Sequence, residues 1–334
     1  YLSSMTSEEE AEKLAEAEKD LITCIPGLPP LHPCELPTSL RCPSLDHYRM
    51  KFVKAQFDEA SKAAAVIVNT VEEIEKKVFD ALEFTAPVYA VGPALLLLDE
   101  AKENPNNNTS TCSGDASLWP VQSECLLWLD KQDHGSVVYV AFGSMLSFEK
   151  PHFVELAMGL EASKRPFLWV VPPYSYRDSV SEVLPDGFIE RTQGVGMIIS
   201  WSPQTLVLSH PSLGAFITHC GWNSLLENLC LGAVPMICWP DAAEQAVNAK
   251  LVTDVWKVGV RVRTRKNRIV HRDEIVRVVN LMFLHEEMNG FKARALELKA
   301  AVSTAVQSGG SSLKNIDKVL DIVKSAKARR FSKG

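Results

Sequence analysis

Apolar residues occur in two patterns along the chain, at helical spacing and in short uninterrupted runs. Both patterns occur in each of two sections. In the first section, residues 49–64 and 71–82 carry apolar side chains at helical spacing, whereas residues 65–69 and 88–92 are short apolar runs. In the second section, comparable short runs lie at residues 137–142, 167–171, 196–200, 215–218, 234–238 and 258–262. Strands that alternate with helices build parallel sheets, so the pattern predicts an α/β fold in both sections.

The second section is the more regular one. Its helical periodicity lies at residues 151–163, 221–231, 244–255, 272–284, 289–307 and 312–326. This succession predicts a complete doubly wound domain. Residues 104–117 are mostly Asn, Ser, Thr, Gly and Pro, and they mark a linker. The expected division is a partial first domain at 1–92, a linker at 93–122, a second domain at 123–308 and a C-terminal helix at 309–334.

Composition and charge exclude several classes of partner. The chain has 334 residues, of which 46% are hydrophobic, a size and composition typical of two globular domains. Its 35 basic and 41 acidic residues give a net charge of −6, which does not attract nucleic acid. The apolar run at residues 91–98 is far shorter than the ~20 residues of a bilayer-spanning helix, so no integral membrane contact is expected.

Two features of the sequence bear on compartment and completeness. The eight cysteines form no C-x-x-C pair and no secretory leader precedes them, which predicts free thiols in the cytoplasm. The chain opens with Tyr1 and no strand precedes the helical pattern of residues 8–20, so an upstream part is expected to be missing. The high proline content of residues 26–37 predicts an extended surface segment.

Residue types that bind nucleotides gather between residues 201 and 245, a stretch without Lys or Arg. There a predicted strand leads through His219 and Gly221 into a helix that opens at Asn223 and Ser224. A helix N-terminus offers free N–H groups and a partial positive charge, so it can hold a diphosphate without a lysine. Structural interpretations remain open, because Ser224-x-x-Glu227 also matches a capping box and His219 also fits a paired strand-end histidine.

Three other strand ends carry candidate residues. Gly143-Ser144 follows the run 137–142, Trp201-Ser-Pro-Gln204 follows the run 196–200, and Glu244-Gln245 follows Trp239-Pro240. An indole stacks on a planar base, and a carboxylate with an amide can grip sugar hydroxyls. Taken singly, Gly143-Ser144 also fits a turn, Trp201 also fits core packing, and Glu244-Gln245 also fits a helix start. The carboxyl ends of parallel strands meet at one edge, which favours a common ligand pocket.

Several motifs carry a family resemblance. They are Trp201-Ser-Pro-Gln204, His210-Pro211, Thr218-His219-Cys220-Gly221-Trp222-Asn223-Ser224-x-x-Glu227, Gly232-Ala-Val-Pro235, Trp239-Pro240 and Glu244-Gln245, with Tyr139-Val-Ala-Phe-Gly-Ser144 and Gly309-Gly-Ser-Ser312 outside this stretch. They closely resemble the plant secondary product glycosyltransferase signature of the UDP-dependent glycosyltransferases. The resemblance implies a GT-B fold, in which two Rossmann-like domains face each other across a cleft. The first domain is expected to be incomplete, and the C-terminal helix to return toward it.

The resemblance also implies a role for each matching residue. The expected UDP-binding residues are Ser144, Trp201, Ser202, Gln204, His219, Asn223, Ser224 and Glu227. Among them, Trp201 would stack on uracil, the Ser202 backbone would read the edge of the base, Gln204 and Glu227 would hold the ribose, and the others would bind the diphosphate. The expected sugar contacts are Trp222, Glu244 and Gln245, a set that goes with UDP-glucose.

The implied reaction is an inverting transfer of a hexose, with glucose expected, to a hydroxyl of a small lipophilic or phenolic acceptor. No metal and no cofactor are expected, since the chain lacks an Asp-x-Asp motif. The family's histidine base and its aspartate partner have no match here, so the catalytic residue is unassigned and the isolated chain is expected to be weak or inactive. A monomer is expected. The alternative is a catalytically silent UDP-sugar-binding protein.

Two other observations complete the predictions. A Rossmann dehydrogenase is a third hypothesis, but Gly194-Val-Gly196 is not followed by the further glycine of a dinucleotide motif. Asp241 replaces an apolar residue of the family pattern, and Ala233 is one residue more than its Gly-Val-Pro turn contains. The extra residue is expected to shift residues 239–245 relative to the phosphate site.

Overall fold

A computed structural model describes residues 20–41, 44–97, 124–143, 150–172, 183–264 and 269–331. Within these ranges a six-stranded sheet forms the centre of the second section, in the order β5-β4-β3-β6-β7-β8, with every neighbouring pair parallel. Its strands are β3 (Val137–Ala141), β4 (Phe167–Val170), β5 (Gly196–Ile199), β6 (Leu213–Thr218), β7 (Met236–Cys238) and β8 (Gly259–Arg261). All six predicted strands of this section are therefore confirmed.

The strand order reverses between β3 and β6. The chain builds β3, β4 and β5 outward, and then returns to place β6 on the other side of β3. In open parallel sheets the crevice at such a reversal, outside the carboxyl ends of the strands, is where ligands bind. The residues that follow β3, β5 and β6 lie at this end of the sheet and are therefore candidates for ligand contacts.

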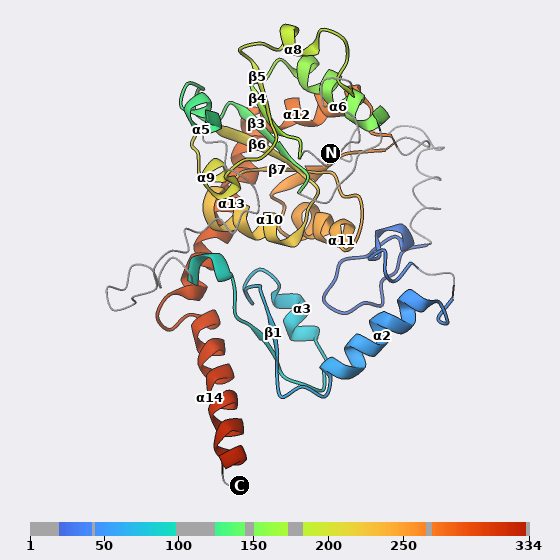
Figure 1. The fold of residues 1–334 in the computed structure, drawn as a ribbon, viewed down its shortest axis with the longest axis vertical. Coiled ribbons are helices and arrows are strands. Elements are labelled where there is room, and N and C mark those ends of the chain that lie inside the picture. Colours follow the sequence, from blue (N-terminus) through green and yellow to red (C-terminus); the bar gives the residue numbers. More distant parts are fainter. Residues whose placement is uncertain are drawn as a thin grey trace.

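Helices cover both faces of this sheet (Figure 1). Alternate residues of β3 face opposite ways, so that Val138 and Val140 pack in one buried cluster and Val137 and Tyr139 in the other. The first cluster is covered by α6 (Lys150–Ser163), α8 (Phe188–Arg191) and α12 (Arg272–Met282). The second is covered by α5 (Glu124–Leu129), α9 (Gln204–Leu208), α10 (Trp222–Glu227), α11 (Gln245–Lys250) and α13 (His285–Val306).

The described part of the first section contains a parallel pair of strands, β1 (Val66–Val68) and β2 (Val88–Ala90). Between them lies α3 (Lys76–Ala81), and α2 (Tyr48–Ala60) precedes β1, so the predicted βαβ alternation is confirmed. The predicted helix at 71–82 is wrong at its start, because residues 71–75 form turns. The Ile74 carbonyl accepts a hydrogen bond from Trp256 Nε1 at 2.8 Å instead of serving a helical N–H.

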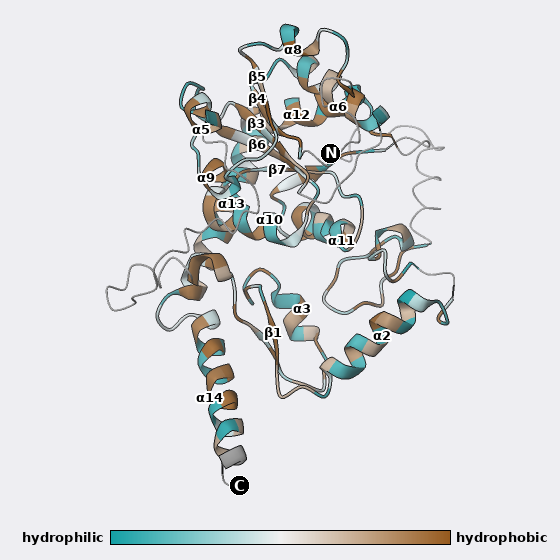
Figure 2. Cartoon of the chain, in the orientation of Figure 1, coloured by the Kyte–Doolittle hydropathy of each residue, from teal (hydrophilic) through white to brown (hydrophobic). Residues whose placement is uncertain are grey.

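The last helix, α14 (Ser311–Phe331), runs along β2 (Figure 1). Ser312 Oγ donates to the Gly92 carbonyl, and Asn315 Nδ2 donates to the Ala90 carbonyl at 3.0 Å. Apolar and polar residues alternate along this helix in Figure 2, and further along it Leu320 and Val323 stay 46% and 58% exposed. None of the described helices combines the length and apolar character that crossing a bilayer requires.

Candidate nucleotide site at the carboxyl ends of the strands

Four of the predicted site residues belong to one hydrogen-bonded network. Ser202 and Gln204 follow β5, whereas Ser224 and Glu227 lie on α10, which follows β6. Gln204 Nε2 donates to Ser224 Oγ at 3.1 Å and to Glu227 Oε2 at 2.6 Å. The amide of Gln204 therefore joins the loop after β5 to the helix after β6, across the position where the strand order reverses.

Tyr139 of β3 also belongs to this network, and it contacts both Ser202 and Gln204. Its hydroxyl donates to Gln204 Oε1 at 3.1 Å, so Ser202 Oγ, 2.8 Å away, donates to the tyrosine oxygen. The side chain of Tyr139 is fully buried, and burial raises the pKa of its hydroxyl far above the ordinary value. Tyr139 is thus a neutral donor that orients the Gln204 amide. Sequence reasoning did not single it out, although one hydroxyl in an otherwise aliphatic strand was a usable signal.

The capping-box interpretation of Ser224 and Glu227 is wrong. The N-cap residue of α10 is Gly221, and Ser224 is the third residue inside the helix. Its hydroxyl faces Gln204 and is not at the cap position. Both side chains therefore point toward the network after β5, where a ligand at the strand ends would lie.

His219 sits between two glycines at the end of β6. An added Cβ at Gly143 would lie 2.9 Å from its Nε2, and one at Gly221 closer still, so the glycines leave the imidazole its place. Gly143 has φ of +74°, a conformation that favours glycine. Burial lowers the pKa of His219 below its ordinary value, although the Glu244 carboxylate opposes the shift, so the ring is neutral at pH 7.

Among the described residues, His219 Nδ1 is a buried polar side-chain atom without a hydrogen-bond partner. Buried polar groups normally have one, and exceptions call for an explanation. Because this atom is closed to solvent, a bound ligand does not account for it, and the diphosphate contact of His219 stays a prediction. Asn223 is exposed at the start of α10 and Trp201 is half-buried after β5, whereas Ser144 lies outside the described residues.

The side chains predicted to contact the sugar have protein partners. Trp222 Nε1 donates to the Asn69 carbonyl at 2.9 Å, which ties α10 to the end of β1. Gln245 Oε1 accepts the backbone N–H groups of Asp241 and Ala242 at 2.9 and 3.1 Å. Glu244 is exposed and its Oε1 accepts from Asn248 Nδ2 at 3.3 Å. Gln245 therefore shapes the loop that follows β7.

The additional residue Ala233 lies at the end of a π-helical turn. After α10 the chain widens into a π-helical turn, Asn228–Gly232, in which the Ala233 N–H bonds to the Asn228 carbonyl at 2.7 Å. The Asn228 side chain bonds both backbone groups of Val234, and the Trp239 N–H reaches the Thr218 carbonyl at 2.8 Å. The turn accommodates the extra residue before β7, and the expected shift of residues 239–245 stays a prediction.

The site is built from neutral donors and one carboxylate. Within the described ranges, no three His, Cys, Asp or Glu side chains converge as metal ligands would. Gln204, Ser202 and Ser224 supply hydroxyl and amide groups, and Glu227 supplies an acceptor. Such a set suits the hydroxyls of a sugar ring beside the donor-rich start of α10.

The chain matches one family model and is similar to curated proteins. Residues 116–273 match the family model described as UDP-glucoronosyl and UDP-glucosyl transferase. A 7-deoxyloganetin glucosyltransferase of Gardenia jasminoides is 40% identical over 301 residues, which is 90% of this chain and 60% of that protein. The chain thus spans about 60% of the length of the curated relatives it matches.

Two solved structures are similar over most of the chain. A UDP-glucosyltransferase from Polygonum tinctorium capable of glucosylating indoxyl, in complex with 3,4-dichloroaniline, has a TM-score of 0.77 and 35% identity, covering 94% of this chain and 67% of that one. Os79 from O. sativa in complex with UDP has a TM-score of 0.78 and 30% identity, covering 90% of this chain and 64% of that one.

Proposed function

Because the chain belongs to the UDP-glucoronosyl and UDP-glucosyl transferase family, with a GT-B type of fold, we propose that its strand-end network binds the UDP moiety of a UDP-sugar. The observation that carries the proposal is the pairing of Gln204 with Glu227, because it places an amide and a carboxylate together at the reversal of strand order. In this proposal the two side chains hold the ribose. Trp201 stacks on uracil, and the Ser202 backbone reads the edge of the base.

The diphosphate is assigned to the start of α10. Ser144, His219, Asn223 and Ser224 would bind it, with His219 donating through Nε2, the ring nitrogen that lies beside Gly143 and Gly221. The sugar is assigned to Trp222, Glu244 and Gln245. Because the side chains of Trp222 and Gln245 already have partners, we assign their contribution to the backbone and loop shape they maintain.

The proposed reaction of the protein is an inverting glucosyl transfer. The acceptor oxygen attacks C1 of the sugar from the face opposite UDP, the bond from C1 to the diphosphate oxygen breaks, and UDP leaves with the electron pair. The hydroxyl proton goes to a general base, for which we assign no residue in this chain. The acceptor class is a small lipophilic or phenolic alcohol, in keeping with plant secondary metabolism. A UDP-sugar-binding protein without turnover is the second candidate.

Cytoplasmic location and a monomeric state are also part of the proposal. The described cysteines, among them the buried Cys125, Cys220 and Cys230, are all free thiols, as is usual in a reducing compartment. The residues assigned to the donor come from a single chain, which is why a monomer is sufficient to bind it. No metal or cofactor is assigned.

Nucleotide selectivity tests the proposal directly. We expect UDP to bind about tenfold or more tightly than ADP, because a stacking surface and backbone contacts set for uracil would leave polar groups of adenine unpaired. Isothermal titration calorimetry of the 334-residue chain with both nucleotides measures this. Equal affinities, or no binding of either nucleotide, would contradict the assignment of the site.

Donor selectivity is a separate prediction. We expect UDP-glucose to bind about tenfold more tightly than UDP-glucuronate, because residues 201–245 contain no Lys or Arg to pair with the extra carboxylate. UDP-galactose is expected to be weaker as well, since Gln245 goes with glucose in the family resemblance. Competition of the three UDP-sugars for one site ranks them, and a clear preference for UDP-glucuronate would overturn the assignment.

A further inference from the structure

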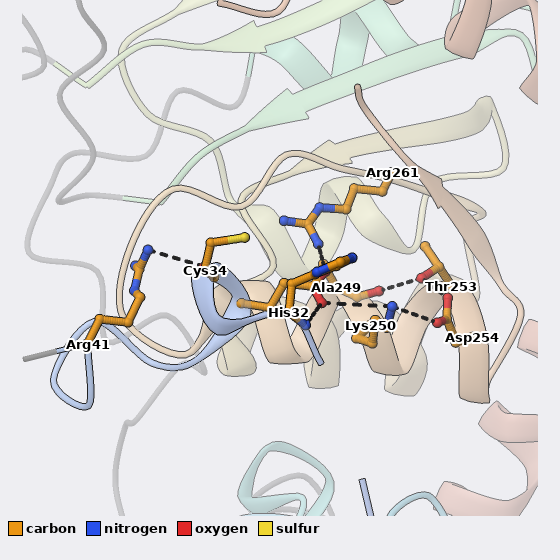
Figure 3. Close-up of polar contacts among 9 residues, drawn as sticks. His32, Cys34, Arg41, Ala249, Lys250, Thr253, Asp254 and Arg261 are labelled. Carbon is orange, nitrogen blue, oxygen red and sulfur yellow. Dashed lines mark hydrogen bonds and ion pairs between the residues drawn. The ribbon is translucent and has the colours of Figure 1, made fainter. Parts of the chain in front are cut away.

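An extended segment from the start of the chain is anchored on the second domain by a buried carboxylate. Glu35 belongs to a short 3-10 helix (Pro33–Glu35) and is only 6% exposed. Its Oε1 accepts from Arg261 Nη1 at 2.5 Å, and its Oε2 accepts the backbone N–H of His32 at 2.9 Å. Lys250 Nζ lies 3.8 Å from Oε2, and the cluster is drawn in Figure 3. The carboxylate therefore has partners on both oxygens.

Arg261 connects this anchor to the candidate donor site. It is the last residue of β8 and pairs in register with Cys238, the last residue of β7. The residue after Arg261 continues the ladder, since the Val262 N–H bonds to the Cys238 carbonyl at 3.0 Å. The loop that follows β7, residues 239–245, therefore begins beside the backbone of Arg261, whose side chain holds Glu35.

A second contact from the same segment reaches the loop itself. The Thr38 N–H donates to the Ala243 carbonyl at 3.0 Å. Ala243 has φ of +53°, a conformation that L-residues adopt only when neighbouring contacts maintain it. On the other side of the loop, Gln245 Oε1 holds the N–H groups of Asp241 and Ala242. The loop is thus held from within by Gln245 and from outside by Thr38.

We infer that Glu35 is a positioning residue for the sugar of the donor. By anchoring residues 33–38 on Arg261 and Lys250, it brings the Thr38 N–H to Ala243 and keeps the loop 239–245 in the shape that receives the sugar. Glu35 does not contact the donor. The inference rests on the proposed function, because it assigns the sugar to this loop.

The physical basis is the buried charge. Removing Glu35 leaves Arg261 without the carboxylate it pairs with, whereas Lys250 keeps Asp254 at 3.2 Å. The loss of the Arg261 pair favours separation of the segment from the domain. Once the segment separates, the carbonyl of Ala243 loses its partner and the strained turn relaxes. The network of Gln204 and Glu227 involves none of these contacts, so UDP itself should be held as before.

Two substitutions isolate the two contacts. Glu35→Ala removes the anchor, and Thr38→Pro replaces the N–H that reaches Ala243 with the ring Cδ. Proline suits position 38, because this residue is the second of a turn closed by the Leu40 N–H on the Pro37 carbonyl at 2.8 Å. Thr38→Ala keeps the N–H and serves as the matched control.

Hydrogen exchange and donor binding provide two readouts. Both test variants should speed exchange of the Asp241 and Ala242 amides and weaken UDP-glucose relative to UDP by about threefold to tenfold, the scale of one hydrogen bond. UDP affinity should stay within about twofold, and Thr38→Ala should match the parent chain. Exchange of the α6 and α12 amides verifies that each variant is folded.

The outcomes separate this inference from the proposed function. Unchanged exchange of the Asp241 and Ala242 amides in both test variants would overturn the positioning role, as would equal losses of UDP and UDP-glucose. A parent chain that binds no UDP would contradict the proposed function instead. The amide exchange in the same variants would then still decide whether Glu35 positions the loop.

Discussion

Replacing Glu227 with alanine is expected to weaken UDP binding by roughly 1 to 3 kcal/mol, the range for losing hydrogen bonds to a charged acceptor. The variant removes the carboxylate assigned to the ribose and also leaves one N–H of Gln204 without its partner at 2.6 Å. Calorimetry with UDP measures the loss, and thermal unfolding measured in parallel reports any change in stability.

A second carboxylate provides the matched control. Glu161 also forms a close charged pair, with Arg191, on the surface away from the strand ends. Glu161→Ala should leave UDP affinity unchanged, because a solvent-exposed pair contributes little beyond its own surroundings. If Glu227→Ala unfolds at a lower temperature and still binds UDP like the parent chain, Glu227 has only a structural role and its assignment to the ribose is wrong.

Glucosyl transfer by the 334-residue chain is expected to be slow even where donor binding is strong. General-base assistance is typically worth about 100- to 10,000-fold, and the family's histidine base has no match in this sequence. Positioning of the acceptor contributes separately. We therefore expect UDP-glucose to bind while turnover of phenolic and alcohol acceptors falls by at least this factor below that of a polypeptide that also carries the base.

The measurement is a transfer assay of the purified chain with UDP-glucose and a panel of acceptors, beside a version extended upstream where one exists. Titration with UDP in the same preparation establishes that the donor site is intact. Rapid turnover by the 334-residue chain would show that it contains a general base not assigned here. The absence of turnover in both versions, with UDP bound, would favour the silent binding protein.

Much of the fold follows from local pattern. Strands such as 137–141 and 213–218 are buried on both faces, so they appear in the sequence as uninterrupted apolar runs. The turns at 71–75 were not predictable in this way. Their apolar spacing is helical, but Val71 and Ile74 pack into a buried cluster of the second section and the Ile74 carbonyl bonds to Trp256, 182 residues later.

In the candidate site, too, residues within short motifs were predictable and residues with partners distant in sequence were not. Gln204, Ser224 and Glu227 belong to compact motifs, so a single sequence indicates them. Tyr139 and Glu35 do not, because their roles depend on partners 65 and 226 residues distant. The direction of the Ser224 side chain was also undecidable from spacing, since it depends on whether the helix begins at residue 222 or, with Ser224 as its N-cap, three residues later.

In the π-helical turn at residues 228–232 a backbone N–H bonds to the carbonyl five residues earlier, so the turn holds one residue more than an α-helical turn. The extra residue widens the helix at this turn. The Asn228 side chain bonds the backbone of Val234, and β7 follows in register with β6. We therefore expect insertions and deletions at this turn to disturb the position of β7 less than a substitution of Asn228 would. We expect relatives that lack a residue at Ala233 to have an ordinary α-helical turn here, with β7 in the same register.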